Sequence, residues 1–119
     1  MNSYKELVVW QKSIELVKET YGLVKLLPKE ETYALSDQMR RAVVSIPSNI
    51  AEGFARKYTK EFVNFISIAL GSNAELETQL TICMELKYIR HDDAIIAFGL
   101  IEEIRKMLIV MRNNLIKNH

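Results

Sequence analysis

The chain has 119 residues, of which 49% are hydrophobic and 26% charged, and its 16 basic and 15 acidic residues leave a net charge of +1. This length fits one domain, residues 1–119, that can bury its own core, and the composition is that of a globular protein. Two prolines and four glycines supply little material for turns, which favours a few long helices over many short strands.

The single cysteine, Cys83, excludes an intrachain disulfide and a zinc site built from several cysteines. The first residues, MNSYKELVVWQ, are interrupted by charge and contain no signal-peptide hydrophobic run. No apolar stretch approaches the roughly 20 residues that span a bilayer. We therefore expect a cytoplasmic protein without a membrane segment.

The first predicted helix runs from Leu7 to Val24 and ends before Pro28. Steps of three and four residues predict that its bundle face consists of Leu7, Trp10, Ile14, Val17, Tyr21 and Val24. Three further apolar residues fall outside this stripe: Val9, Leu16 and Leu23. With Trp10 and Tyr21 they predict a second apolar face on the same helix.

The second predicted helix covers residues 31–56 and contains Pro47. Its apolar face continues in register across the proline and consists of Leu35, Met39, Val43, Ile46, Ile50 and Phe54. A proline inside a helix removes a backbone hydrogen bond and costs about 3 kcal/mol unless the helix bends. Ser45 and Ser48 can hydrogen-bond the freed backbone groups. We therefore predict one helix that is kinked at Pro47.

The third predicted helix begins after Thr59, a good N-cap, and reaches about Tyr88. Its buried residues are expected to be Phe62, Ile66, Ala69, Leu76, Leu80 and Cys83. The fourth follows the IRHDD connection, with Asp92 or His91 as its cap, and its core face is Ala97, Ile101, Ile104, Leu108, Met111 and Leu115. Such short connections make sequence neighbours antiparallel. The fold class is thus all-α, an up-down-up-down four-helix bundle.

Three blocks of this sequence also resemble a known family. The blocks are LVVWQKSIELVKETY, PKEETYALSDQMRRAVVSIPSNIAEGFAR and FVNFISIALGSNAELETQL, in this order. They resemble the bacterial four-helix bundles called 23S rRNA intervening-sequence proteins, a family that also carries a ribosomal-protein label. The resemblance implies a ring-like homo-oligomer, typically a pentamer. It also implies a fold similar to the accessory variability protein of diversity-generating retroelements, which binds nucleic acid and a reverse transcriptase.

A polar stripe follows the second helix at spacings of three and four residues: Gln38, Arg41, Ser45, Asn49, Glu52 and Arg56. An antiparallel third helix could place Ser72, Asn73 and Glu75 opposite this stripe, with Glu75 near Arg41, and Gly71 would permit a close backbone approach. The stripe is either a binding site or a polar network that fixes packing. We assign six of these residues to such a structural network: Arg41, Asn49, Glu52, Ser72, Asn73 and Glu75.

The motifs of an enzyme are missing from the sequence. No glutamate precedes a histidine at the spacing used by bundle metal sites, and the two histidines, His91 and His119, lie in a connection and at the end. Gly53 and Gly71 are isolated glycines within helices and form no phosphate loop. Acid–base chemistry by Glu52 and Glu75 is the remaining enzymatic alternative. We expect no enzyme, no metal and no cofactor.

Basic residues gather in two segments that each carry +4: Gln38–Lys60 has five cations and one acid, and Ile104–His119 has four cations and none. Such charges are either an ordinary solvated surface or contacts to phosphates of RNA or DNA. The candidate nucleic-acid-binding residues are Arg40, Arg56, Lys57, Lys60, Arg105, Lys106 and Arg112.

The fourth helix carries surplus apolar residues outside its core face: Ile95, Ile96, Ile109 and Val110. One bundle core needs one apolar stripe per helix, so the surplus predicts a subunit interface and a homo-oligomer. We therefore expect a non-enzymatic scaffold or accessory module that binds structured RNA or DNA. The alternative is an adaptor whose outer apolar helix faces dock a partner protein, without nucleic acid.

Overall fold

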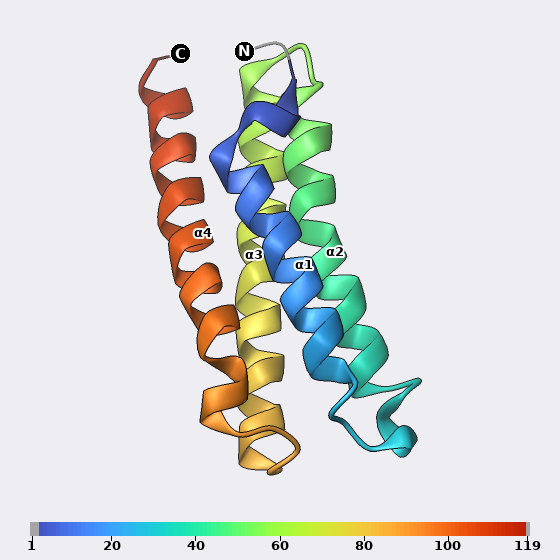
Figure 1. Ribbon diagram of the computed structural model, residues 1–119. Helices are drawn as coiled ribbons and strands as arrows, with labels where there is room; N and C mark the ends of the chain where they lie inside the picture. The colour runs from blue at the N-terminus through green and yellow to red at the C-terminus, as the bar shows by residue number, and fades with distance from the viewer. Residues whose placement is uncertain (1–2, 119) are drawn as a thin grey trace.

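The computed structural model describes residues 3–118 and contains four long helices joined by short connections (Figure 1). The helices are α1 (Val8–Val24), α2 (Leu35–Phe54), α3 (Thr59–Glu85) and α4 (His91–Lys117). Single turns of 3-10 helix, η1 (Tyr4–Glu6) and η2 (Lys29–Glu31), precede α1 and α2. The predicted all-α fold with four helices is confirmed.

The four helices alternate in direction, and each packs against its sequence neighbours (Figure 1). Contacts between α1 and α4 close the ring, so all four helices surround one core. The α2–α3 turn and the C-terminal end of α4 lie at one end of the bundle, and the other two connections lie at the opposite end. We call the first of these the C-terminal end of the bundle.

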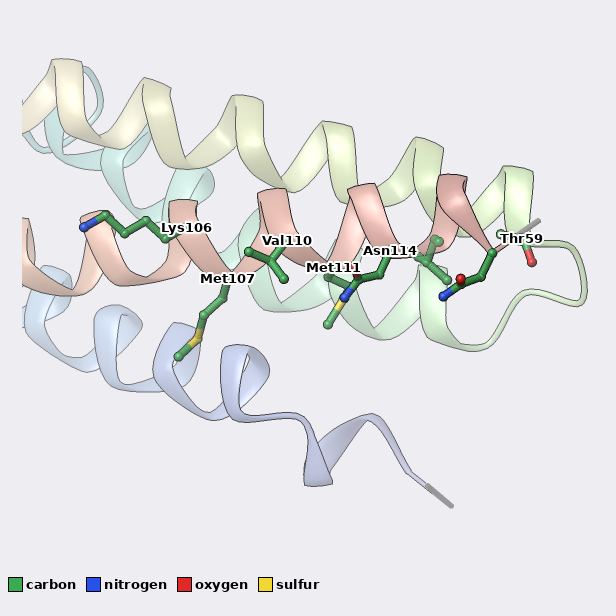
Figure 2. Close-up of a pocket in the computed structure, with 8 residues that line it drawn as sticks. Thr59, Lys106, Met107, Val110, Met111 and Asn114 are labelled. Atoms are coloured by element: carbon green, nitrogen blue, oxygen red, sulfur yellow. The ribbon is translucent and has the colours of Figure 1, made fainter.

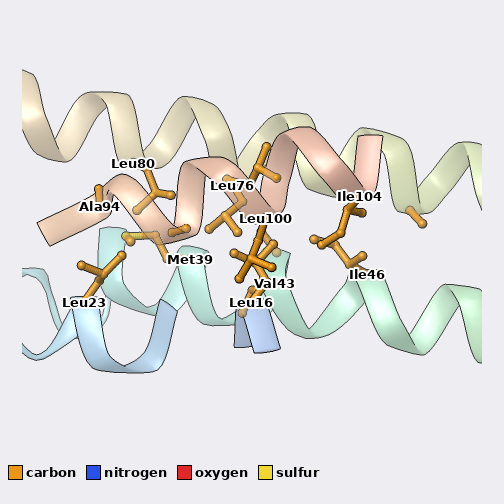
Figure 3. Close-up of a cluster of buried hydrophobic side chains, with 14 of the residues drawn as sticks. Leu16, Leu23, Met39, Val43, Ile46, Leu76, Leu80, Ala94, Leu100 and Ile104 are labelled. Atoms are coloured by element: carbon orange, nitrogen blue, oxygen red, sulfur yellow. The ribbon is translucent and has the colours of Figure 1, made fainter. Parts of the chain in front are cut away.

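Side chains from all four helices meet in the core (Figure 3). Leu16, Ile46, Leu76 and Ile104 each have no exposed surface. The centres of the faces predicted for α2, α3 and α4 are buried, whereas residues near the helix ends, such as Leu115, are partly exposed. Three of the four predicted core faces are therefore correct.

The predicted core face of α1 is wrong by one position. The face that packs into the bundle consists of Val9, Ser13, Leu16, Thr20 and Leu23. Trp10 is only partly buried and Tyr21 is 41% exposed. Both faces follow the same three-and-four spacing. The apolar pattern did not identify the correct face, because that face contains the polar residues Ser13 and Thr20. Ser13 can be buried because its hydroxyl donates a hydrogen bond to the carbonyl of Trp10, 2.6 Å away.

Helices α2 and α3 begin differently from the prediction. The turn η2 occupies the predicted start of α2, which begins only at Leu35, where the backbone N–H donates to the Glu31 carboxylate at 3.4 Å. Tyr58, not Thr59, is the N-cap of α3, and it makes no side-chain capping bond.

The connection between α3 and α4 also differs from the prediction. The chain leaves α3 at Lys87, whose φ of 62° is left-handed, and the N–H of Tyr88 then donates to the carbonyl of Cys83 at 2.9 Å. In α4 the N-cap is Arg90, and neither His91 nor Asp92 has this role. The carboxylate of Asp93 accepts a bond from the Arg90 N–H at 2.9 Å.

Pro47 lies inside α2, which continues through it as one helix of 20 residues. The side chain of Pro47 is buried, as is that of its neighbour Ile46. Two residues after the proline, the side-chain amide of Asn49 donates to the carbonyl of Ser45, one turn earlier, at 2.7 Å. The prediction of one uninterrupted helix is correct, and the kink at Pro47 stays a prediction.

Gly53 is the glycine on which the packing of α2 against α3 depends. A Cβ atom at this position would lie 2.8 Å from Cβ of Phe65 and 2.9 Å from Cδ1 of Phe62. Cβ of Phe65 is fixed to the α3 backbone and cannot move aside alone. For Gly71 the expected close backbone approach is absent within residues 3–118, because nothing lies within 4 Å of its Cβ position.

We predict that Gly53→Ala lowers the free energy of unfolding by about 1–3 kcal/mol, because the added methyl overpacks the α2–α3 contact. The matched control is Gly71→Ala, also inside a helix but in open space. It should raise the free energy of unfolding by about 0.5–1 kcal/mol. Urea denaturation of both variants measures the difference, and two changes of the same sign would contradict the packing argument.

Candidate functional site

Part of the predicted polar stripe forms a hydrogen-bonded network between α2 and α3. The hydroxyl of Ser72 on α3 donates to the hydroxyl of Ser45 on α2 at 2.8 Å. The side-chain amide of Asn49 donates to the same Ser45 hydroxyl, also at 2.8 Å. Both bonds satisfy partly buried polar groups, and the bond between Ser72 and Ser45 fixes how the two helices are paired along their length.

The other residues assigned to the structural network do not join these bonds. Asn73 faces the core and donates to the carbonyl of Ile101 in α4 at 2.9 Å. The guanidinium of Arg41 pairs with Asp37, one turn earlier, at 3.2 Å rather than with Glu75. Glu75 is exposed. The pair between Asp37 and Arg41 was not predicted, although an acid four residues before an arginine in a helix indicates such a pair.

The enzymatic alternative required Glu52 and Glu75 to share a pocket. The Glu52 side chain is 61% exposed and pairs with Arg56 at 3.8 Å, as the i, i+4 spacing predicts.

In the described part of the chain, no three residues of the types His, Cys, Asp and Glu cluster to hold a metal ion. None of the helices in that part is both long enough and apolar enough to cross a membrane.

Cys83 places a thiol in the core. It has no exposed surface, and its sulfur lies 3.6 Å from the sulfur of Met39. Burial disfavours the thiolate and raises the pKa of Cys83 from 9.0 to about 11. The thiol is therefore protonated in the folded protein at neutral pH and behaves as a small apolar group.

We predict that Cys83 makes the free energy of unfolding fall as the pH rises from about 9 to about 11. In this range the unfolded chain loses the thiol proton while the folded chain keeps it, so deprotonation favours unfolding, by up to about 2–3 kcal/mol. Chemical denaturation over this pH range tests the slope. The Cys83→Ala variant, although less stable overall, should show a shallower slope, and parallel curves would contradict this assignment.

Arg40 is held by the connection between α1 and α2. Its side chain is 30% exposed, and its guanidinium donates to the carbonyl of Thr32 at 3.1 Å. The carboxylate of Asp37 lies 4.0 Å away. This cation therefore orders the connection before α2 and is poorly placed to reach a phosphate.

Arg105 and Lys106 share one carboxylate. Nε of Arg105 donates to Glu102 at 3.1 Å, and a second nitrogen of the same guanidinium bonds the other oxygen. This pairing is the main cause that lowers the pKa of Glu102, and Lys106 lies 3.7 Å from the same group. The count of +4 for Ile104–His119 left out the two acids that come directly before it, Glu102 and Glu103. Residues 102–119 hold four cations and two acids, a net charge of +2.

Four candidate cations lie near the C-terminal end of the bundle: Arg56, Lys57, Lys60 and Arg112. Arg56 lies over the ring of Phe65 at 4.8 Å, and Lys57 lies over Tyr58 at 5.6 Å. Within residues 3–118, neither Lys57, Lys60 nor Arg112 forms an ion pair. Residues 37–61 as a whole hold five cations and three acids, or +2.

A groove runs along the last turns of α4 and reaches the start of α3 at Thr59 (Figure 2). Its volume is about 610 Å³, and its walls are mainly apolar, with Met107, Met111 and Leu115 partly buried and Val110 58% exposed. Lys106, Asn114 and Asn118 complete the lining. The sequence interpretation placed Met111 and Leu115 in the core and did not consider Met107, so it missed this groove.

A second, smaller groove of about 320 Å³ lies on the outside of α1 and α2. It is lined by Tyr4, Trp10, Ile14, Val17, Val44, Pro47, Ser48 and Ala51. These include α1 residues that were predicted to face the core. Tyr4 and Trp10 contact each other edge to face, with ring centroids 5.3 Å apart.

Four helices around one core, with a polar link between α2 and α3, define a helical-bundle protein. The chain belongs to the 23S rRNA-intervening sequence protein family, whose model matches residues 5–110. It is 30% identical to a crystallised protein of unknown function from the S23 ribosomal protein family of Bacteroides thetaiotaomicron VPI-5482. That likeness covers 88% of this chain and 98% of the other, with a TM-score of 0.81. None of the curated proteins matches the sequence.

Proposed function

We propose that this protein is a non-enzymatic, self-associating scaffold of the cytoplasm that binds phosphates of structured RNA or DNA. One observation carries the nucleic-acid part: the cations of the α2–α3 turn lie at the same end of the bundle as the last turns of α4 (Figure 1). A groove lined by both Thr59 and Asn114 places these two elements side by side. Local ion pairs do not neutralise Lys57, Lys60 or Arg112 in the described chain.

The proposed contacts carry no sequence readout. Lysine and arginine at helix ends neutralise phosphates whatever the bases, and binding of this kind weakens steeply with salt. Two positively charged segments with a net charge of only +2 each make a weak site on one chain. A closed ring of identical chains would repeat the site and raise the affinity through multivalency. Self-association is therefore part of the same proposal.

The outer face of α1 and α2 is our candidate for the contact between chains. It exposes aromatic and aliphatic side chains beside the groove that contains Trp10, with Tyr21 and Val44 each 41% exposed. Aromatic residues are enriched at the centres of protein interfaces. The family resemblance supports a ring of five copies.

We predict a solution mass of about 69 kDa, five copies of the 13.8-kDa chain, by light scattering. Val44→Glu should lower this mass because it places a charge in the proposed contact. The matched control, Ile96→Glu on α4, changes a residue that is 59% exposed and should leave the mass unchanged. A monomeric parent protein would overturn self-association, and dissociation by Ile96→Glu alone would move the contact to α4.

We predict that the double variant Lys57→Glu/Lys60→Glu binds a fluorescent RNA hairpin and duplex DNA at least about tenfold more weakly than the parent. Fluorescence anisotropy at two salt concentrations measures both affinities. The parent should lose affinity at the higher salt concentration.

The matched control for this experiment is Lys25→Glu/Lys29→Glu, which makes the same change of charge at the opposite end of the bundle. It should weaken binding far less. Equal losses in the two double variants would mean that only net charge matters, and a parent protein that binds neither nucleic acid at low salt would sink the proposal.

A further inference from the structure

The ring of four helices is incomplete at the C-terminal end of the bundle. Lys12 on α1 pairs with Glu103 on α4, with 2.6 Å between Nζ and the carboxylate oxygen, and this contact shows which turns of the two helices are level. Because the helices are antiparallel, Val8, the first residue of α1, lies near residue 107. The remaining turns of α4, about 15 Å of helix, extend beyond α1.

The turn η1 does not fill the missing position, because it packs against α1 and α2 and does not contact α4. Burial along α4 changes accordingly. Ile104 and Leu108 have no exposed surface, whereas the next residues on the same face, Met111 and Leu115, are only partly buried. The groove in Figure 2 is thus the end of the bundle core, where α2, α3 and α4 continue but α1 has ended.

We propose that this groove binds a short amphipathic helix of another protein, with apolar residues on one face and acidic residues beside them. Met107, Met111 and Leu115 recur every four residues, which matches the apolar face of a helix lying along α4. Methionine side chains are flexible and polarizable, so such a groove accepts partner side chains of several shapes.

The charges beside the groove select the chemistry of the partner. Lys106 lines the groove, and its side chain is 68% exposed and lies 3.7 Å from Glu102. Lys117 follows eleven residues later, about three helical turns, and therefore lies on the same side of α4. Acidic residues flanking an apolar stripe would pair with Lys106 and Lys117, and basic ones would be repelled.

A second copy of the chain fits this position less well. A symmetric contact between two α4 ends would bring Lys106 and Lys117 of both copies to the same interface. The groove also differs from the phosphate-binding surface proposed above, because its walls are apolar and nucleic acid is not. The proposal therefore stands or falls separately from the proposed function.

The test uses yeast that display amphipathic helices of about 14 residues, long enough to span the groove. Their apolar positions are randomised, and their flanking positions are either all acidic or all basic. Fluorescently labelled full-length protein should enrich acidic helices about tenfold or more over basic ones. No enrichment, or equal enrichment of both classes, would overturn the proposal.

Two variants of α4 show whether the groove is the site. Val110→Glu places a negative charge at a lining residue that is 58% exposed, and enrichment should be lost. Ile95→Glu makes the same kind of change at a residue of the same helix that is 55% exposed, and enrichment should persist. Equal effects of both variants would place the binding elsewhere.

Hydrogen exchange on the unmodified protein gives a result that does not depend on either variant. An enriched helix should slow exchange in residues 107–117, and protection confined to other elements would refute the groove. Val110→Glu should leave RNA binding and the solution mass unchanged. Weaker RNA binding would assign the groove to the nucleic-acid surface, and a lower mass would assign it to a second copy; either result would overturn the proposal.

Discussion

The difference in length between α1 and α4 is the constraint on which the rest of this structure depends. Helix α1 has 17 residues and α4 has 27, so α1 is about 15 Å shorter. Where α1 is present, the ring is complete and residues such as Leu16 and Ile104 are fully buried. Where it ends, the apolar face of α4 continues without a partner. The core is thus closed where α1 is present, and an apolar groove opens where α1 ends.

Polar side chains inside the bundle fix which neighbours meet. The bond between Ser45 and Ser72 pairs α2 with α3, and the bond from Asn73 to the carbonyl of Ile101 pairs α3 with α4. Apolar packing alone tolerates sliding by one helical turn, whereas a buried hydrogen bond is lost if its partner moves. Gly53 adds a steric constraint of the same kind, since a Cβ atom at this position would collide with Phe62 and Phe65. The polar groups inside this bundle therefore act in helix packing, by pairing α2 with α3 and α3 with α4.

Ion pairs between neighbouring turns decide which cations can act on a partner. Glu102 holds Arg105, and Asp37 lies beside both Arg40 and Arg41. Each of these acids lies within four residues of the cation with which it pairs, so the pairing can be read from helical spacing. Lys57, Lys60 and Arg112 form no ion pair within residues 3–118, and these three cations lie near one end of the bundle. The electrostatic surface thus follows from local spacing, while its location follows from topology.

The sequence by itself determined the helical class, the four helices, the family and three of the four core faces, because apolar periodicity of three and four residues is a local property. It also determined the Glu52–Arg56 pair, which needs only one helix. Tertiary structure decided what needs two helices. The core face of α1 was one such feature, because Ser13 and Thr20 are buried only where neighbouring helices cover them. The α4 groove was another, because Met111 and Leu115 have the same spacing whether or not α1 extends far enough to cover them.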